Sequence, residues 1–189
     1  MSMSPARQAL QQRVTAAILE GAARIMAARG PEASMNDVAV AAGVARATVY
    51  RYFPNRQALL DELALVALRA ADERLGSARL HEVPVEEGVT RVVRALVDVG
   101  DPFIVVARER ARPDEFERTV AAPVGRLLER GRAGGEIRDD LPLPWLIEVL
   151  LGILVSVLGS SPRRGREDTV AAITGLFLDG ARRRGPRLP

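Results

Sequence analysis

Cysteine is absent from the 189-residue sequence, and the chain contains one histidine, His81. Without thiols there is no disulfide framework and no thiol catalysis, and one histidine leaves a structural zinc site almost without ligands. We therefore expect neither a metal site nor a cofactor. The lack of cysteine also suits a reducing compartment, so we expect a cytoplasmic protein. His81 stands in the segment ARLHEVP and is interpreted as a surface loop residue rather than a catalytic base.

Long apolar runs are also missing. The first residues, MSMSPARQALQQR, lack the apolar segment of a secretory signal peptide. The longest apolar stretch, residues 145–158, is interrupted by Glu148 and is too short to span a bilayer. We expect no membrane partner. Hydrophobic residues nevertheless make up 48% of the chain, which is enough to bury a core and argues against overall disorder.

The patterns of catalysis are missing as well. The sequence contains no pairing of a nucleophile with a base, no glycine-rich phosphate loop and no cluster of metal ligands. Adjacent acidic residues, such as Asp61-Glu62 and Asp139-Asp140, point apart on a helix and are interpreted as solvated faces. The sequence therefore predicts that the protein is not an enzyme.

Lysine is absent too, so all 27 basic residues are arginines, and they are unevenly distributed. The net charge is +3, but residues 1–56 carry a formal charge of +4, residues 57–162 carry −5 and residues 163–189 carry +4. A basic segment is typical of a surface that binds a polyanion, and the acidic segment should be repelled by the same partner.

Helical periodicity runs through the whole chain, and no segment alternates apolar and polar residues for long. We therefore expect an all-α fold. The first helix is predicted over residues 13–29, where Val14, Ile18, Ala22 and Ile25 form an apolar stripe before Gly30-Pro31.

Two short helices follow, separated by a glycine. Ser34, followed three residues later by Asp37, is close to a capping box and predicts a helix that ends at Gly43. A second short helix is predicted over residues 45–53, and Asn55 is a good cap for a long helix that starts at Arg56. This arrangement describes a helix-turn-helix motif, although two ordinary core helices would give a similar pattern.

The second short helix combines aromatic residues with arginine in a chain that is only 4% aromatic. In a major groove, Arg46 at its N-terminal end could bind guanine O6 and N7, and Thr48 could contact thymine or a phosphate. The hydroxyls of Tyr50 and Tyr52 could donate to phosphates, and Arg56 would supply a further phosphate contact. The alternative is that both tyrosines are half-buried packing residues with hydrated hydroxyls.

The segment MNDVAVAAGVARATVYRYFPNRQALL resembles the DNA-binding signature of the tetracycline-repressor (TetR) family of bacterial regulators. The resemblance covers about residues 13–62 and implies an all-α homodimer with an N-terminal helix-turn-helix and a C-terminal domain for ligand binding and dimerisation. By position it implies that the DNA contacts are Asn36, Arg46, Ala47, Thr48, Tyr50, Tyr52 and Arg56. Two positions depart from the family pattern: Ala45 replaces a serine-like cap, and Arg56 stands where lysine is frequent.

The rest of the chain predicts further helices, with breaks near Pro84, residues 100–102, Pro113, residues 134–135 and residues 160–162. The last two helices, predicted over 144–158 and 168–182, are the most apolar part of this half. We interpret them as half of a four-helix dimer interface, with plain core packing as the alternative. The predicted interface residues are Leu150, Leu154, Val170, Ile173 and Phe177.

The domain prediction divides the chain into residues 1–57 (DNA binding), 58–183 (ligand binding and dimerisation) and 184–189 (a disordered basic tail that could add phosphate attraction). Apolarity and the family resemblance suggest a pocket for an unidentified, apolar small-molecule inducer. The predicted pocket residues are Leu63, Val66, Phe103, Ile104, Phe116 and Trp145, with packing in the core as the alternative for each of them.

The sequence therefore predicts a regulator, most simply a repressor, that binds a pseudo-palindromic operator in double-stranded DNA as a homodimer and is released by an inducer. One alternative is a ligand-independent nucleoid or architectural protein that binds DNA. Another is a small-molecule carrier or enzyme in which the basic segment is merely structural.

Overall fold

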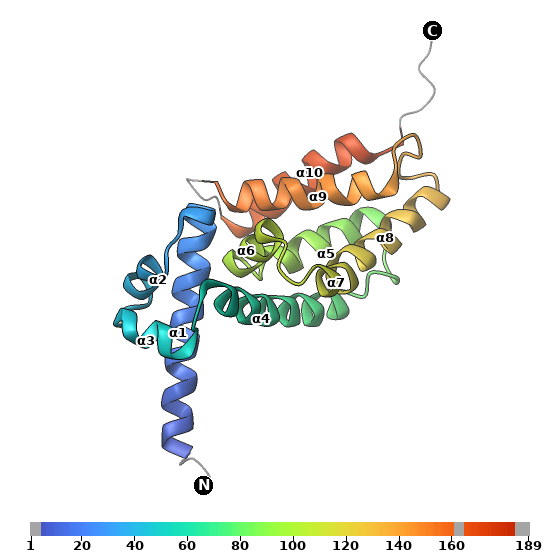
Figure 1. Ribbon diagram of the computed structural model, residues 1–189. Coiled ribbons are helices and arrows are strands. Elements are labelled where there is room, and N and C mark those ends of the chain that lie inside the picture. Colours follow the sequence, from blue (N-terminus) through green and yellow to red (C-terminus); the bar gives the residue numbers. More distant parts are fainter. Residues whose placement is uncertain (1–4, 161–164, 184–189) are drawn as a thin grey trace.

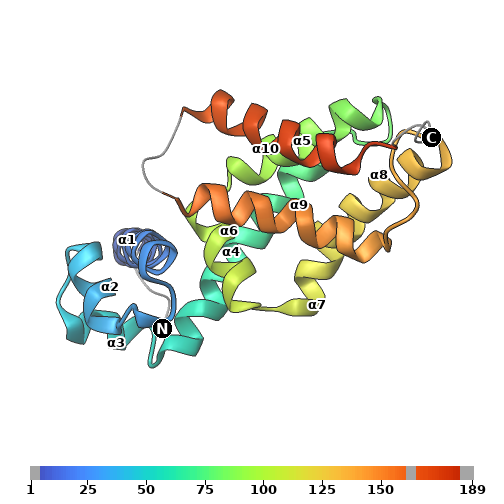
Figure 2. The same ribbon diagram turned by 90° about the horizontal axis from the view of Figure 1, so that it is seen from above.

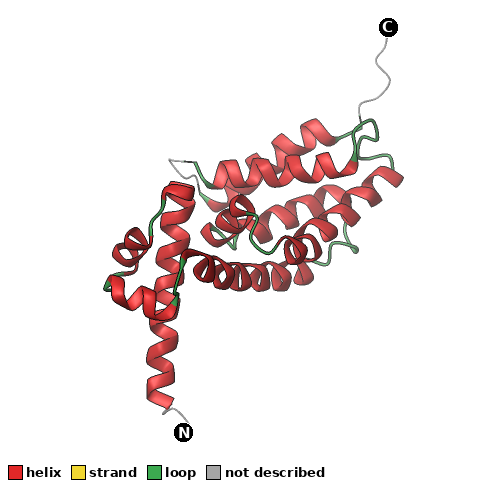
Figure 3. Cartoon of the chain, viewed as in Figure 1, coloured by secondary structure: helices red, strands yellow, loops and turns green. Residues whose placement is uncertain are grey.

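The computed structural model describes residues 5–160 and 165–183, so the predicted tail, residues 184–189, lies outside the described residues. The all-α prediction is confirmed, because the described residues form helices and loops without a strand (Figure 3). An isolated bridge joins Ile137 to Arg182. Within the described ranges, no helix combines the length and the apolarity that crossing a bilayer requires.

The helices lie in two groups (Figure 1). In chain order they are α1 (Pro5–Arg29), the 3-10 turn η1 (Gly30–Glu32), α2 (Met35–Ala42), α3 (Arg46–Tyr52), α4 (Arg56–Ser77), α5 (Val85–Val97), α6 (Asp101–Glu109), α7 (Pro113–Phe116), the π-helical turn η2 (Glu117–Ala121), α8 (Ala122–Ala133), α9 (Leu143–Leu158) and α10 (Arg166–Ala181). We call α1–α3 the head and α4–α10 the body. Seen from above, the head lies to one side of the body and α1 is viewed nearly end-on (Figure 2).

Helix α1 begins at Pro5, eight residues before the predicted start at Arg13. The apolar stripe begins only at Val14, because residues 5–13 are exposed and need no apolar face. These residues are mostly good helix formers, and proline is tolerated in the first turn of a helix. The periodic pattern therefore indicated the buried part of α1 but not its exposed extension.

The short helices of the head are defined by local signals, as predicted. Ser34 and Asp37 form a full capping box at the start of α2, and Gly43 ends α2 in the left-handed conformation with φ +67°. The side chain of Asn55 accepts a hydrogen bond from the backbone N–H of Ala58 and caps α4. The Ala45 side chain provides no cap for α3, in agreement with the departure noted in the sequence.

Helix α1 packs against α2 at very short range. A β-carbon built on Gly21 would lie 2.7 Å from the backbone nitrogen of Ala42 and 2.9 Å from its α-carbon. Only glycine fits at this point, because the obstacle is backbone and cannot turn aside. The spacing between α1 and the helix-turn-helix therefore depends on the missing side chain at position 21.

The buried apolar residues form two clusters, one centred in the head and one in the body. The head cluster contains Ile18, Val38 and Val49, but it also includes Leu59 and Leu63 of α4. It is completed by two neighbouring residues of α6, Ile104 and Val105. The predicted boundary at residue 57 thus lies just inside α4, whose first turns and the start of α6 share the core of the head.

The body helices follow the predicted breaks. Helices begin at Val85, Asp101 and Pro113, and α8 ends at Ala133 just before the two glycines. The last two helices, predicted over 144–158 and 168–182, begin within two residues of those positions and pack against each other.

Candidate DNA-binding surface and ligand cleft

Helix α3 is held by its apolar side and presents its polar side to solvent. Val49 is fully buried and Phe53 nearly so, and both pack in the head cluster. Arg46, Ala47 and Tyr50 are exposed. Because two buried anchors fix one side of this short helix, the opposite side has a defined orientation and can act as a reading surface.

Two arginine–tyrosine pairs line α3. The guanidinium carbon of Arg46 lies 5.4 Å from the ring centroid of Tyr50, and that of Arg51 lies 5.3 Å from the ring of Tyr52. These distances are within the range of cation–π contacts, which stiffen a long arginine side chain before a ligand arrives. Tyr52 is half-buried against the head core, so it contributes packing as well as a hydroxyl.

Helix α2 braces α3 and is tied to α1 by polar contacts. Arg24 donates to the carbonyl of Ala41, and Arg29 forms an ion pair of 2.9 Å with Asp37. Hydrogen bonds from Ser34, together with Arg29, hold the pKa of Asp37 below its ordinary value. Asn36, one of the predicted DNA contacts, is exposed in the first turn of α2. Most of the predicted DNA residues therefore lie at the surface of the head.

Arg56 has a partner that the sequence did not indicate. Its guanidinium makes two hydrogen bonds, of 2.6 and 3.2 Å, to the carboxylate of Glu109 at the end of α6. This carboxylate raises the pKa of Arg56 above its ordinary value. The Nε atom of Arg56 is buried without a hydrogen-bond partner among the described residues. In this structure Arg56 joins the first turn of α4 to α6, whereas the sequence predicted a phosphate contact.

We expect Arg56→Gln and Glu109→Gln each to lower the free energy of unfolding by about 1–2 kcal/mol, because a charge-assisted bidentate pair is lost from a partly hydrated site. The double variant should lose less than the sum of the two single variants in urea denaturation. Measuring DNA affinity at several salt concentrations distinguishes the ion pair of Arg56 with Glu109 from a contact of Arg56 with a phosphate. If Arg56 also contacts a phosphate, Arg56→Gln will flatten the salt dependence of DNA affinity and Glu109→Gln will not. Additive stability losses would contradict the pairing.

The predicted interface residues of the last two helices are buried within the single chain. Leu150, Leu154, Val170, Ile173 and Phe177 each expose 2% or less of their surface and belong to the body core. They are buried by their own chain, so they are not available to a second molecule. At these five positions the structure shows the alternative, in which the side chains pack in the core of a single chain.

The opposite side of α9 and α10 remains apolar and exposed. Trp145, Val149 and Leu176 expose 63%, 50% and 62% of their surface. Gly152 is exposed and Gly175 half-exposed on the same helices, and a β-carbon on either would meet no described atom within 4 Å. Large apolar side chains beside open glycines are typical of a surface that receives another helix pair.

An open cleft of about 1060 Å³ lies in the angle between α1, α4 and the start of α6. Three of the predicted pocket residues, Leu63, Val66 and Ile104, line it. The cleft is less apolar than expected, because Glu20, Glu62 and Asp101 also line it, together with glutamines of α1. The guanidinium of Arg24, the basic residue in the lining, donates to the carbonyl of Ala41.

The other three predicted pocket residues lie elsewhere. Phe103 is buried in the body core and stacks on Phe116, with ring centroids 6.1 Å apart. Trp145 lies on the exposed side of α9 and not in the cleft. Apolarity alone could not separate residues that line a cleft from residues that fill a core or cover a surface.

Comparison with known proteins places this geometry in a family. The model of the family described as bacterial regulatory proteins, tetR family, matches residues 18–63. The HTH-type transcriptional repressor LfrR of Mycolicibacterium smegmatis is 34% identical over 146 residues, which cover 76% of this chain and 77% of LfrR. The chain belongs to the tetR family. It is a transcriptional regulator with a helix-turn-helix DNA-binding head, as the sequence predicted.

Solved tetR-family structures share the fold over most of the chain. The structure of LfrR from Mycobacterium smegmatis in complex with proflavine is 27% identical, with a TM-score of 0.65 over 94% of this chain and 99% of LfrR. A regulatory protein of the tetR family from Rhodococcus RHA1 is 16% identical, with a TM-score of 0.67 over 88% of this chain and 95% of its own, which shows the fold alone.

The family-model match, residues 18–63, includes most of the head but not α6, whose contacts join the head to the body. At the end of α6, Arg108 donates to the carbonyl of Ala27 at 2.8 Å, next to the ion pair of Glu109 with Arg56. These partners are 81 and 53 residues apart in sequence. Neither α6 residue could be predicted from the sequence, because no local pattern identifies a partner at that separation.

Proposed function

We propose that this tetR-family protein is a homodimeric repressor that binds a pseudo-palindromic operator and is released by a small-molecule inducer. The observation that carries the proposal is the exposed side of α3, where Arg46 and Tyr50 are stacked on a helix anchored by Val49 and Phe53. Arg46 would read a guanine edge, while Asn36, Thr48 and the tyrosines would contact neighbouring groups on the duplex.

The dimer would form through the exposed side of α9 and α10. A single seven-residue reading helix makes too few base contacts for a specific site, and a two-fold axis doubles them over half-sites about 34–36 Å apart. Trp145, Val149 and Leu176 would be covered by the same residues of a second copy, because a two-fold interface is self-complementary.

The inducer would bind in the cleft between α1, α4 and α6. This cleft touches both the head and the body, so a ligand there can change their relative position. Its carboxylates Glu20 and Glu62 would favour a positive charge, and Leu63 and Val66 supply apolar surface. A flat aromatic cation therefore fits better than the purely apolar inducer expected from the sequence. Because the related LfrR has been solved in complex with proflavine, this dye is the first ligand to test.

The test is selection of a random duplex pool on the purified protein at two salt concentrations, followed by sequencing. Enrichment of a two-fold symmetric motif whose retention falls with salt would support the repressor. Salt-sensitive retention without a motif would instead favour the architectural alternative, and no retention would argue for the carrier.

Adding proflavine to the complex of the protein with the selected duplex then tests release of the DNA. Unchanged DNA binding would contradict the inducer assignment for this class of ligand.

Arg46→Ala is expected to cost about 1–3 kcal/mol at one base pair of each half-site and to relax the preference there, because a bidentate contact to a base edge is lost. Competition binding with operators changed at single positions measures this effect. The matched control is Arg51→Ala, which removes the same charge from the same helix and should weaken all duplexes alike. Uniform weakening by Arg46→Ala would contradict its role in base reading.

A further inference from the structure

A second cleft, of about 470 Å³, lies at the far end of α4 from the head. It is bounded by the last turns of α4, the loop 78–84 and the start of α8 with its preceding π-helical turn. Its lining includes Arg79, Arg118, Arg126 and Arg130, with Asp72 as the acidic residue. We call it the arginine cleft. Its basic lining stands out because residues 57–162 together carry a formal charge of −5.

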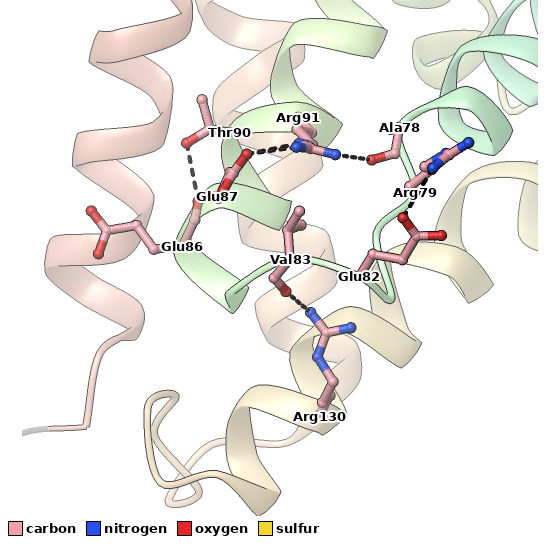
Figure 4. A network of polar contacts seen from close by, with 9 residues as sticks. All are labelled: Ala78, Arg79, Glu82, Val83, Glu86, Glu87, Thr90, Arg91 and Arg130. Atoms are coloured by element: carbon pink, nitrogen blue, oxygen red, sulfur yellow. Dashed lines mark hydrogen bonds and ion pairs between the residues drawn. The ribbon is translucent and has the colours of Figure 1, made fainter.

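The loop that forms one wall of the arginine cleft is held in place by hydrogen bonds (Figure 4). Arg130 donates to the carbonyls of Leu80 and Val83, at 2.8 and 2.6 Å, and Arg91 donates to the carbonyl of Ala78 at 2.8 Å. Arg79 forms an ion pair of 3.3 Å with Glu82. The wall is therefore formed before any ligand binds, and Arg79 and Arg130 already have partners.

Arg118 and Arg126 differ from these two residues. Neither forms a hydrogen bond or an ion pair with any described residue, and both are exposed at the arginine cleft. Arg126 also lies one turn before Arg130, and like charges at this spacing repel each other. Two unpaired guanidinium groups beside a third leave a local excess of positive charge that a bound anion would neutralise.

The backbone around the arginine cleft is unusual at two separate places. Arg79 has φ +48°, a left-handed conformation that residues other than glycine seldom adopt. Arg118 lies in the π-helical turn η2, and such turns occur frequently at functional sites. Both features lie at arginines that line the same cleft. Strained or irregular backbone tends to persist where a functional site requires it.

We propose that the arginine cleft binds a small organic anion with a carboxylate or phosphate head and an apolar body. The head would lie between Arg118 and Arg126, whose forked guanidinium groups match the oxygen geometry of such anions. The body would pack on Leu75, Leu80 and Leu127, which line the same cleft. The volume is that of a small-ligand site. This site is separate from α3 and from the cleft between α1, α4 and α6, and it goes beyond the proposed operator binding and induction.

The proposal is tested by calorimetry on the full chain with four probes: octanoate, inorganic phosphate, octyltrimethylammonium and polyglutamate. We expect octanoate to bind with an affinity that falls with salt, phosphate to bind more weakly because it lacks the apolar body, and the cation not to bind at this site. Arg118→Gln and Arg126→Gln should each weaken octanoate at least about tenfold. The matched control is Arg69→Gln, an exposed arginine of α4 outside the arginine cleft, which should leave the affinity unchanged.

Several outcomes would overturn the proposal. Failure of octanoate and phosphate to bind, or equal affinity in the three arginine variants and the wild type, would show that the arginine cleft is not an anion site. Loss of binding in Arg69→Gln as well would indicate a general charge effect. If polyglutamate binds through Arg118 and Arg126 and octanoate does not bind, the partner of the arginine cleft is an acidic protein rather than a small anion. Operator binding is measured separately, so failure here leaves the proposed repressor function untouched.

Discussion

Leu176→Glu is expected to yield a folded monomer that no longer selects a two-fold symmetric operator. Leu176 exposes 62% of its surface on α10, so a carboxylate there costs the single chain little. In a two-fold interface, however, the change places two like charges close together in an apolar contact. Because specific binding is typically about 10³-fold or more tighter than non-specific binding, loss of the dimer should lower operator affinity by at least about that factor.

Sedimentation analysis together with operator binding measures the effect of Leu176→Glu. The control is Leu10→Glu, which makes the same change at a leucine of nearly the same exposure, 63%, on α1. That variant should remain a dimer. A dimeric Leu176→Glu protein with normal operator affinity would show that the exposed side of α9 and α10 is not the interface.

Gly21→Ala is expected to destabilise the head by about 3 kcal/mol, at the upper end of the cost of overpacking, because the added methyl group meets backbone rather than a movable side chain. The β-carbon would lie 2.7 Å from the backbone nitrogen of Ala42, so α2 and with it α3 must shift away from α1. Operator affinity should fall together with thermal stability, because the position of α3 depends on that contact.

Gly76→Ala provides the contrast for Gly21→Ala. Gly76 is also helical, but a β-carbon there would meet no described atom within 4 Å. Alanine at this position should leave stability unchanged or raise it by about 0.5–1 kcal/mol, because glycine weakens a helix relative to alanine. Equal stability of the two variants in thermal denaturation would show that α1 and α2 can separate freely and that the close approach at Gly21 has no structural role.

The head could be predicted from sequence because its signals are local. The capping box of Ser34 and Asp37, the left-handed Gly43 and the cap of Asn55 each act within four residues and fix where a helix begins or ends. The exposed extension of α1 before Val14 carries no apolar periodicity, so the start of that helix was predicted too late.

The proposed binding surfaces of the body could not be predicted in the same way. Both sides of α9 are apolar, and the sequence prediction selected Leu150 and Leu154, which fill the core, rather than Trp145 and Val149, which face solvent. Periodicity shows that a helix has an apolar side but not whether its own chain or a partner covers it. Tertiary contacts decide this, as they do for the pairing of Arg56 with Glu109.

The shared core of the head has a consequence for exchanging modules between related regulators. Ile104 and Val105 of α6 pack in the same cluster as Ile18 and Val49. A chimera joined at residue 57 would therefore set the transplanted helix-turn-helix on foreign side chains at the two α6 positions and at Leu59 and Leu63 of α4, leaving either voids or clashes. Hybrid repressors made from this protein should carry α6 and the first turns of α4 along with α1–α3, since the core of the head is assembled from two separate stretches of the chain.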